Sequence, residues 1–132
     1  MWDDLSPFLT GAGPTATILD PDGTPNNILD VTLGGSITVE WSFSGAAVGF
    51  LAVTDFDVQV FADPVGAGSN VSVGEVSDVG PGPAYSVSLP INLGVGAYRL
   101  TTLITSTVAG TGVSLPIAGF VDGPIIQIRP GP

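Results

Sequence analysis

The sequence predicts an all-β fold, and three observations lead to this class. Apolar and polar residues alternate with a period of two along much of the chain, as in strands with one buried face. Glycine and proline, at 19 and 12 residues, gather in turn-like stretches between the alternating segments. No segment carries a convincing helical period. Short strands joined by such turns are typical of a β-sandwich.

About seven strands follow from the alternation. In 36–43 (SITVEWSF), 55–61 (DFDVQVF) and 84–91 (AYSVSLPI), every second residue is apolar, so one face of each strand is expected to be buried. Shorter segments rich in β-branched and aromatic residues complete the set: TATIL, NVSV, YRLTTLIT and PIIQIR. In chain order, the expected strands cover residues 15–19, 36–43, 55–61, 70–73, 84–91, 98–105 and 124–129.

One domain and a short arm account for the chain. No internal repeat and no long linker divides it, so residues 14–132 are expected to form one sandwich, preceded by an N-terminal arm, 1–13. The GAG segment at 11–13 is interpreted as a flexible hinge. We expect the arm to dock on a neighbouring copy, with its own domain as the alternative. Its apolar residues form the predicted contact: Trp2, Leu5, Phe8 and Leu9.

Two residues suggest a relationship to known sandwiches. Trp41 closes the strand pattern SITVEW, and Tyr98 stands in LGVGAYRL at the start of a strand. At these points the chain resembles the immunoglobulin-like and fibronectin type III-like sandwiches, in which a tyrosine of this kind bonds back to the upstream backbone. The resemblance implies a single immunoglobulin-like antiparallel sandwich. The chain departs from antibody-type domains in lacking cysteine, and its loop-rich segment 63–83 is longer than a simple version needs.

Composition limits the possible partners. The 132 residues include 12 acids and 2 arginines, with no lysine or histidine, for a net charge of −10. Nucleic acids and anionic membrane surfaces are therefore unfavourable partners, because both require clusters of cationic side chains. The longest uncharged apolar run, 45–53, is nine residues and too short to span a membrane. The start of the chain has no signal-peptide pattern, which favours the cytoplasm if Met1 is native and allows export if a leader was removed.

Missing residue types restrict the chemistry. Without histidine, cysteine or lysine, the chain cannot build imidazole- or thiolate-based nucleophilic sites, Schiff bases or a P-loop. Asp55 and Asp57 could in principle act as a carboxylate pair in glycoside hydrolysis. They alternate with core positions on one strand, however, so a solvated strand face is the preferred interpretation. The sequence thus predicts a protein that is not an enzyme and needs no cofactor.

A metal site is the remaining chemical alternative. The segment DPDGTPNNILD places several oxygen ligands around a tight loop, and such hard ligands suit calcium. Its spacing is not that of an EF-hand, and a plain β-turn with solvated aspartates is the preferred interpretation. The candidate ligands are Asp20, Asp22, Asn26 and Asp30.

Arg99 is one of only two cationic side chains. Alternation places it outward, on the same face as Leu103. It is expected to form either an ordinary pair with Glu40, Asp55 or Asp57, or a contact with an acid of another subunit. Low charge density and a mean hydropathy of +0.51 favour a surface that is covered by other copies. The sequence therefore predicts a structural subunit of a homo-oligomeric assembly, for example a filament or a surface layer. The alternative is a carbohydrate-binding module or a calcium-dependent adhesion domain.

Overall fold

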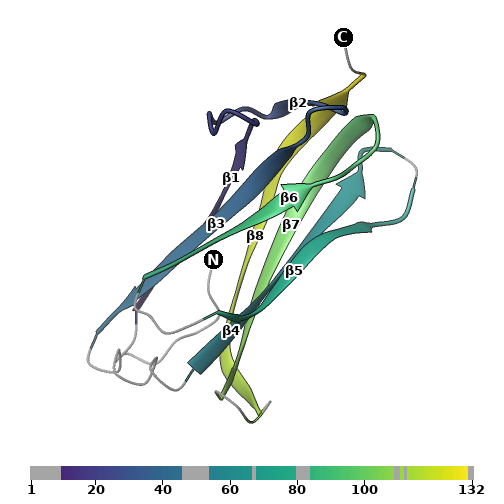
Figure 1. The fold of residues 1–132 in the computed structure, drawn as a ribbon. Coiled ribbons are helices and arrows are strands. Elements are labelled where there is room, and N and C mark those ends of the chain that lie inside the picture. The colour runs from purple at the N-terminus through teal and green to yellow at the C-terminus, as the bar shows by residue number, and fades with distance from the viewer. Residues whose placement is uncertain are drawn as a thin grey trace.

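The computed structural model confirms the all-β class (Figure 1). It describes residues 10–45, 54–66, 68–79, 84–108, 111 and 113–130, and within these ranges it contains no helix. Eight strands follow one another along the chain: β1 (Thr10–Leu19), β2 (Ile28–Asp30), β3 (Gly35–Ser44), β4 (Thr54–Pro64), β5 (Val71–Val79), β6 (Ala84–Ile91), β7 (Gly96–Val108) and β8 (Ser114–Arg129).

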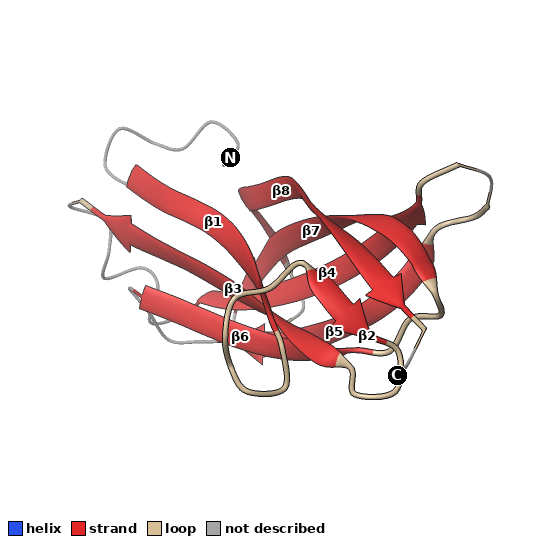
Figure 2. Ribbon diagram, turned by 90° about the horizontal axis from the view of Figure 1, so that it is seen from above, coloured by secondary structure: helices blue, strands red, loops and turns tan. Residues whose placement is uncertain are grey.

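The strands form two sheets, as the view in Figure 2 shows. One sheet has three strands in the order β1-β3-β6, and the other has five in the order β2-β8-β7-β4-β5. The pairing is antiparallel except between β2 and β8, which run parallel. The expected seven strands therefore become eight, and the sheets are not wholly antiparallel. β2 was missed because its three residues are too few to show an alternating pattern.

The two sheets pack face to face around one core, an arrangement compatible with a β-sandwich. Along β3 and β4, buried apolar residues alternate with more exposed, mostly polar residues, as the sequence predicts. Rings from both sheets meet in this core: the Phe56 ring centroid lies 5.8 Å from that of Trp41 and 4.9 Å from that of Tyr85. The buried apolar side chains are Ile18, Leu29, Ile37, Val39, Trp41, Phe43, Phe56, Val58, Val60, Ala62, Tyr85, Leu89, Ile91, Leu93, Leu100, Ile104, Ile126 and Ile128.

The first strand begins earlier than expected. β1 starts at Thr10, which pairs with Ser44 of β3, so the GAG segment at 11–13 belongs to a strand and is not a hinge. A bulge between Ala12 and Thr15 interrupts the pairing of β1 with β3. Gly13 allows this bulge because its backbone has a φ of +83°, a conformation that costs other residues energy.

Two other boundaries differ from the expectation. The segment 63–83 is less loop-rich than its composition suggests, because β4 continues to Pro64 and β5 covers Val71–Val79. The last strand was expected at 124–129, but β8 starts at Ser114. Its central glycine and proline residues hide the strand in the sequence, since both residue types usually signal a turn.

Tyr98 bonds back to the upstream backbone, as its sequence context predicts. Its hydroxyl donates a hydrogen bond of 3.0 Å to the carbonyl oxygen of Gly94, and its ring packs against the core. Gly96 lies beside this ring with a φ of +154°, a backbone conformation that L side chains rarely adopt, while an added Cβ would make only an ordinary contact of 3.6 Å with the Tyr98 ring. The hydrogen bond ties the loop before β7 to the strand itself.

We expect Tyr98→Phe to lower the free energy of unfolding by about 1 kcal/mol, because a single hydrogen bond is lost. Tyr85→Phe is the matched control: the buried Tyr85 hydroxyl has no hydrogen-bond partner, so its removal should leave stability unchanged or raise it. Urea denaturation measures both. Equal effects of the two substitutions would contradict a structural role for the Tyr98 hydrogen bond.

Candidate functional site

The outward side of β7 forms the centre of the candidate site. Alternation along this strand buries Leu100, Thr102 and Ile104 and turns Arg99 and Leu103 to the outside, as the sequence predicts. This side is the outer face of the five-stranded sheet, and we call it the outer face below. Of the predicted interface residues, it holds Arg99 and Leu103.

Neighbouring strands add apolar side chains to the outer face. Phe120 of β8 stands directly opposite Leu103, and Ile125 of the same strand stands opposite Arg99. Their exposed fractions are 44% for Phe120, 53% for Ile125 and 38% for Leu103, which is high for large apolar residues. The half-buried Phe61 of β4 follows on the other side, opposite Thr101. These four side chains form what we call the apolar cluster.

The sequence analysis missed most of this cluster. Phe120 precedes the expected strand 124–129, which does contain Ile125, and Phe61 is the last residue of the expected strand 55–61. The available signal was Phe120 itself, an aromatic residue without a place in any predicted core strand. Because Phe120 and Leu103 are far apart along the chain, the sequence does not show that they stand opposite each other on neighbouring strands.

Among the residues that the structure describes, Asp122 is the ion partner of Arg99. The Arg99 Nη1 atom lies 3.7 Å from the Asp122 Oδ2 atom, and both side chains are about half exposed, at 53% and 54%. The expected intrachain partners, Glu40, Asp55 and Asp57, were therefore wrong. Glu40 belongs to the other sheet, and the register puts Asp63, rather than Asp55 or Asp57, opposite Arg99 on β4. An ion pair this exposed contributes little to stability.

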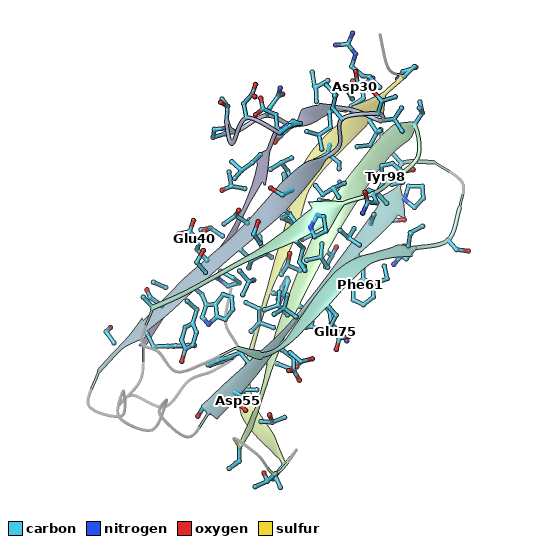
Figure 3. All side chains as sticks on the ribbon, viewed as in Figure 1. Asp30, Glu40, Asp55, Phe61, Glu75 and Tyr98 are labelled. Carbon is cyan, nitrogen blue, oxygen red and sulfur yellow. The ribbon has the colours of Figure 1, made fainter. Side chains whose placement is uncertain are left out.

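Charges are distributed unevenly along the outer face. Both arginines of the chain, Arg99 and Arg129, lie on its strands β7 and β8 and are exposed. Asp55 and Asp57 stand toward the opposite end, next to Thr107 and Thr105 of β7. In Figure 3, Asp55 marks this end of the molecule, and Tyr98, the neighbour of Arg99, lies toward the other.

Glu75 adds a carboxylate at the edge of the outer face, level with Leu103. It stands opposite Gln59, whose side-chain amide donates a hydrogen bond of 3.0 Å to its carboxylate. Figure 3 shows Phe61 and Glu75 on the side of the molecule away from Glu40. The outer face thus combines an apolar centre, an acidic end, and an end where arginines and acids are mixed.

The predicted calcium ligands form turns in the described structure. The Asp20 carboxylate accepts hydrogen bonds of 3.0 Å from the backbone amides of Asp22 and Thr24, and the Asn26 side chain accepts one from Ile28. The Asp30 carboxylate accepts bonds from the Thr32 hydroxyl and amide, which hold its pKa below the ordinary value. Over the described ranges, no three acidic, cysteine or histidine side chains group as metal ligands would.

Trp41 and Tyr85 do not form an exposed sugar-binding platform. Trp41 stacks on Tyr85, with ring centroids 5.1 Å apart and planes at 10°, and both rings are buried between the sheets. The Trp41 indole nitrogen and the Tyr85 hydroxyl have no hydrogen-bond partner. Burial, and secondarily the negative charge of Asp55, raise the pKa of Tyr85, so this hydroxyl stays protonated at neutral pH.

Two surface hollows are open to solvent and have few reactive side chains in their lining. One crosses the outer side of the three-stranded sheet, where small or acidic residues such as Ala12, Thr15, Glu40 and Ala84 line it. Trp41 and Tyr85 border this hollow, but their buried side chains belong to the core, so their unpaired polar atoms do not serve it. A second hollow lies beside the loop that follows β1. Neither is a convincing catalytic cleft.

The remaining predicted contacts lie outside the described residues. They are the arm residues Trp2, Leu5, Phe8 and Leu9, whose proposed docking stays a prediction. Within the described ranges, no helix has the length and apolar character needed to cross a membrane.

The comparisons with known proteins leave the family open. No protein-family model matches the sequence, and none of the curated proteins matches it significantly.

Proposed function

We propose that the chain is a sandwich of the immunoglobulin-like and fibronectin type III-like group. Two features support this architecture: two sheets that share one core, and the hydrogen bond from Tyr98 to the backbone of Gly94. A tyrosine near the start of a late strand that bonds to the preceding residues is a hallmark of immunoglobulin-like sandwiches. This architecture hosts many functions, so the function has to be argued from the surface.

In this proposal the chain works by contact and has no catalytic activity. It serves as a subunit of a homo-oligomeric assembly, and the outer face is the surface that other copies cover. The observation that supports it is the apolar cluster, in which the exposed Leu103 stands opposite the exposed Phe120, and the exposed Ile125 stands opposite the half-exposed Arg99. Aromatic, aliphatic and arginine side chains of this kind are typical of buried interface centres.

The composition supports the same proposal. Charged residues make up only 11% of the chain, whereas monomeric proteins depend on interspersed charges to remain soluble. The small polar side chains between the apolar ones, Thr101 and Thr105, lose little solvation when they are covered. The absence of histidine, cysteine and lysine removes the most common catalytic groups, which favours a structural function over an enzymatic one.

We expect Leu103→Asp to weaken self-association by at least about tenfold, because the substitution puts a charge in the apolar centre of the contact. The fold should survive, since Leu103 lies outside the core. Sedimentation velocity over a range of concentrations measures association, and thermal unfolding monitors the fold.

Leu33→Asp is the matched control. Leu33 is 68% exposed in the turn after β2, so the same substitution there should leave association unchanged. An unsubstituted chain that stays monomeric at high concentration would refute the assembly proposal. If the Leu103→Asp variant associates as strongly as the unsubstituted chain, the contact between copies must lie on another surface. If calorimetry instead showed that calcium or a sugar binds, the alternative function, a ligand-binding module, would replace the assembly proposal.

A further inference from the structure

We infer that the free edge of β6 is a docking site, along which a second copy of this chain adds its own β6 in the antiparallel direction. The contact joins the two three-stranded sheets into one sheet of six strands. This inference goes beyond the proposed function, which concerns the outer face of the other sheet, and gives the assembly a second contact. The argument starts from the backbone groups that β6 leaves unpaired.

β6 has the most regular free edge among the strands that the structure describes. It is the last strand of its sheet and pairs with β3 over its whole length without a register shift (Figure 2). The other sheet edges are less regular: a bulge at Gly13 interrupts β1, two register shifts interrupt β5, and β2 has only three residues. Irregular or short edges resist pairing with another chain, so β6 is the edge that can accept a strand.

The sheet register determines which backbone groups of β6 face outward. The Ile18 carbonyl oxygen of β1 accepts a hydrogen bond from the Asn26 amide and therefore points away from β3. In an antiparallel ladder, two directly opposite residues point their backbone groups either both toward each other or both away. Ile37 lies opposite Ile18, so its backbone groups point away from β1 and toward Leu89 of β6.

Alternation extends this assignment along β6. Leu89 turns its backbone groups to β3, every second residue does the same, and the residues between them turn their groups outward. The outward residues are Ala84, Ser86, Ser88 and Pro90. Proline fits this position because it has no amide N–H and is tolerated where a strand edge faces solvent. Within the described part of the chain, no other strand pairs with this side of β6.

The free edge is complementary to itself about Ser86. With a two-fold axis at this residue, Ser86 lies opposite its own counterpart and Ala84 lies opposite Ser88, so every outward amide in the segment meets a carbonyl group. Pro90 lies beyond this paired segment. Registers centred closer to Pro90 put a carbonyl group opposite a residue without an N–H, and registers centred further away shorten the ladder.

Symmetry also determines the orientation of the second copy. In a parallel ladder, residues of one strand that point toward the partner lie opposite residues that point away. A two-fold axis along the strands puts each residue opposite itself, so two copies of β6 cannot form a parallel ladder. The antiparallel arrangement satisfies the ladder and puts the inward side chains of both copies on the same side, with Tyr85 next to Val87 of the second copy.

Side chains at this edge allow the approach of a second copy. β6 contains no charged residue, and its outward residues are small. Glu40 of β3 lies opposite Ser86, so the Glu40 residues of the two copies are three strand spacings apart. This distance is about 14 Å, which exceeds the screening length of about 8 Å in physiological salt. Glu75 of β5 accepts its hydrogen bond from Gln59 on the outer face and points away from this edge.

The partner strand must match β6 on both sides. Its inward side chains have to be apolar, because they continue the core, and its outward side chains have to be small and uncharged. The β6 strand of a second copy meets both requirements in the register centred on Ser86. The occupant that we assign to this edge is therefore a second copy of the chain.

Single cysteines test the contact and its register, because the chain has none of its own. We expect Ser86→Cys to form an intermolecular disulfide on mild oxidation, since the Cα atoms of a directly opposite, hydrogen-bonded pair lie about 5.5 Å apart, within the range of a disulfide. Ser88→Cys alone should link much less, and Thr17→Cys, exposed on β1, measures the background. More linkage of Ser88→Cys than of Ser86→Cys would overturn the inference.

Amide hydrogen exchange gives an independent measurement of the same contact. The outward amides of Ser86 and Ser88 should exchange rapidly in dilute solution and more slowly as the protein concentration rises. The amide of Val87 points to β3 and should exchange slowly at every concentration. Equally fast exchange of Ser86 at low and high concentration would show that no second copy occupies the edge.

Proline at position 86 removes the central outward amide and leaves the bonds to β3 in place. We expect Ser86→Pro to weaken dimerisation through this edge by at least about tenfold, because two symmetry-related hydrogen bonds are lost. Ser86→Thr keeps the amide and is the matched control, so it should associate like the unsubstituted chain. Thermal unfolding checks that both variants fold. Equal association of the two folded variants would contradict pairing through the backbone.

Sedimentation of the Leu103→Asp variant separates this contact from the one on the outer face. That variant should still form a dimer at high concentration, and adding Ser86→Pro should remove it. A Leu103→Asp variant that is monomeric at all concentrations would refute the edge contact and preserve the proposed function. Association that depends on Ser86→Pro but not on Leu103→Asp would refute the outer-face contact and support the inference.

Discussion

Phe56→Ala is expected to lower the free energy of unfolding by about 3–5 kcal/mol, because it leaves a large cavity in a close-packed core. Phe56 is fully buried, and its ring contacts rings from the opposite sheet. The Phe56 and Phe43 centroids lie 5.6 Å apart, and the Phe56 and Tyr85 centroids 4.9 Å. Since the total stability of a domain is about 5–15 kcal/mol, this single change threatens folding at physiological temperature.

Phe120→Ala is the control for this prediction. It removes the same side chain from the outer face, where Phe120 is 44% exposed, and should cost less than about 1 kcal/mol in the monomer. Urea denaturation at low protein concentration compares the two variants. Similar losses at both positions would show that Phe56 does not hold the two sheets together. If Phe56→Ala is too unstable to purify, Phe56→Leu provides the same comparison with a smaller cavity.

Gly13→Ala is expected to cost about 2–4 kcal/mol, because it combines backbone strain with a steric conflict. The φ of Gly13 is +83°, and an added Cβ would stand 2.9 Å from the Glu40 carbonyl oxygen of the neighbouring strand. Neither backbone can move far without breaking the pairing of β1 with β3. We expect a lower midpoint in urea and faster amide hydrogen exchange in these two strands.

Gly23→Ala separates the two causes. Gly23 has a nearly equal φ of +81°, but no atom lies within 4 Å of its added Cβ. Only the strain remains there, so the expected cost is about 1–2 kcal/mol. Equal effects at the two glycines would mean that the close approach of β1 to β3 does not constrain Gly13.

Much of the fold could be predicted because alternation is a local property. The four apolar residues of segment 36–43 are all buried in β3, and the outward position of Arg99 follows from one step along β7. Errors occurred where local signals were weak or misleading. β2 is too short to alternate, and Gly123 and Pro124 hide the continuity of β8. The GAG segment looks flexible by composition, yet pairing with β3 makes it part of a strand.

The candidate site was only partly accessible from the sequence. Arg99 and Leu103 could be placed on one face because they share a strand and differ by four positions. Asp122 could not be identified as the partner of Arg99, since the pairing of β7 with β8 includes a register shift between Arg99 and Thr101. Such a bulge changes which side chains meet, and it leaves no reliable trace in composition.

Alternation and composition were enough to establish which side chains of each strand face inward, which reactive residue types are missing, and that the chain is poor in charge. Tertiary structure decided which outward side chains become neighbours. Leu103 meets Phe120, and Arg99 lies at one end of a face whose other end is acidic, only because β4, β7 and β8 are adjacent in one sheet. The two kinds of information differ because one is local in the chain and the other is not. The inward or outward direction of a residue repeats every two positions along one strand, whereas contacts across strands depend on sheet order and register, which the whole core sets together.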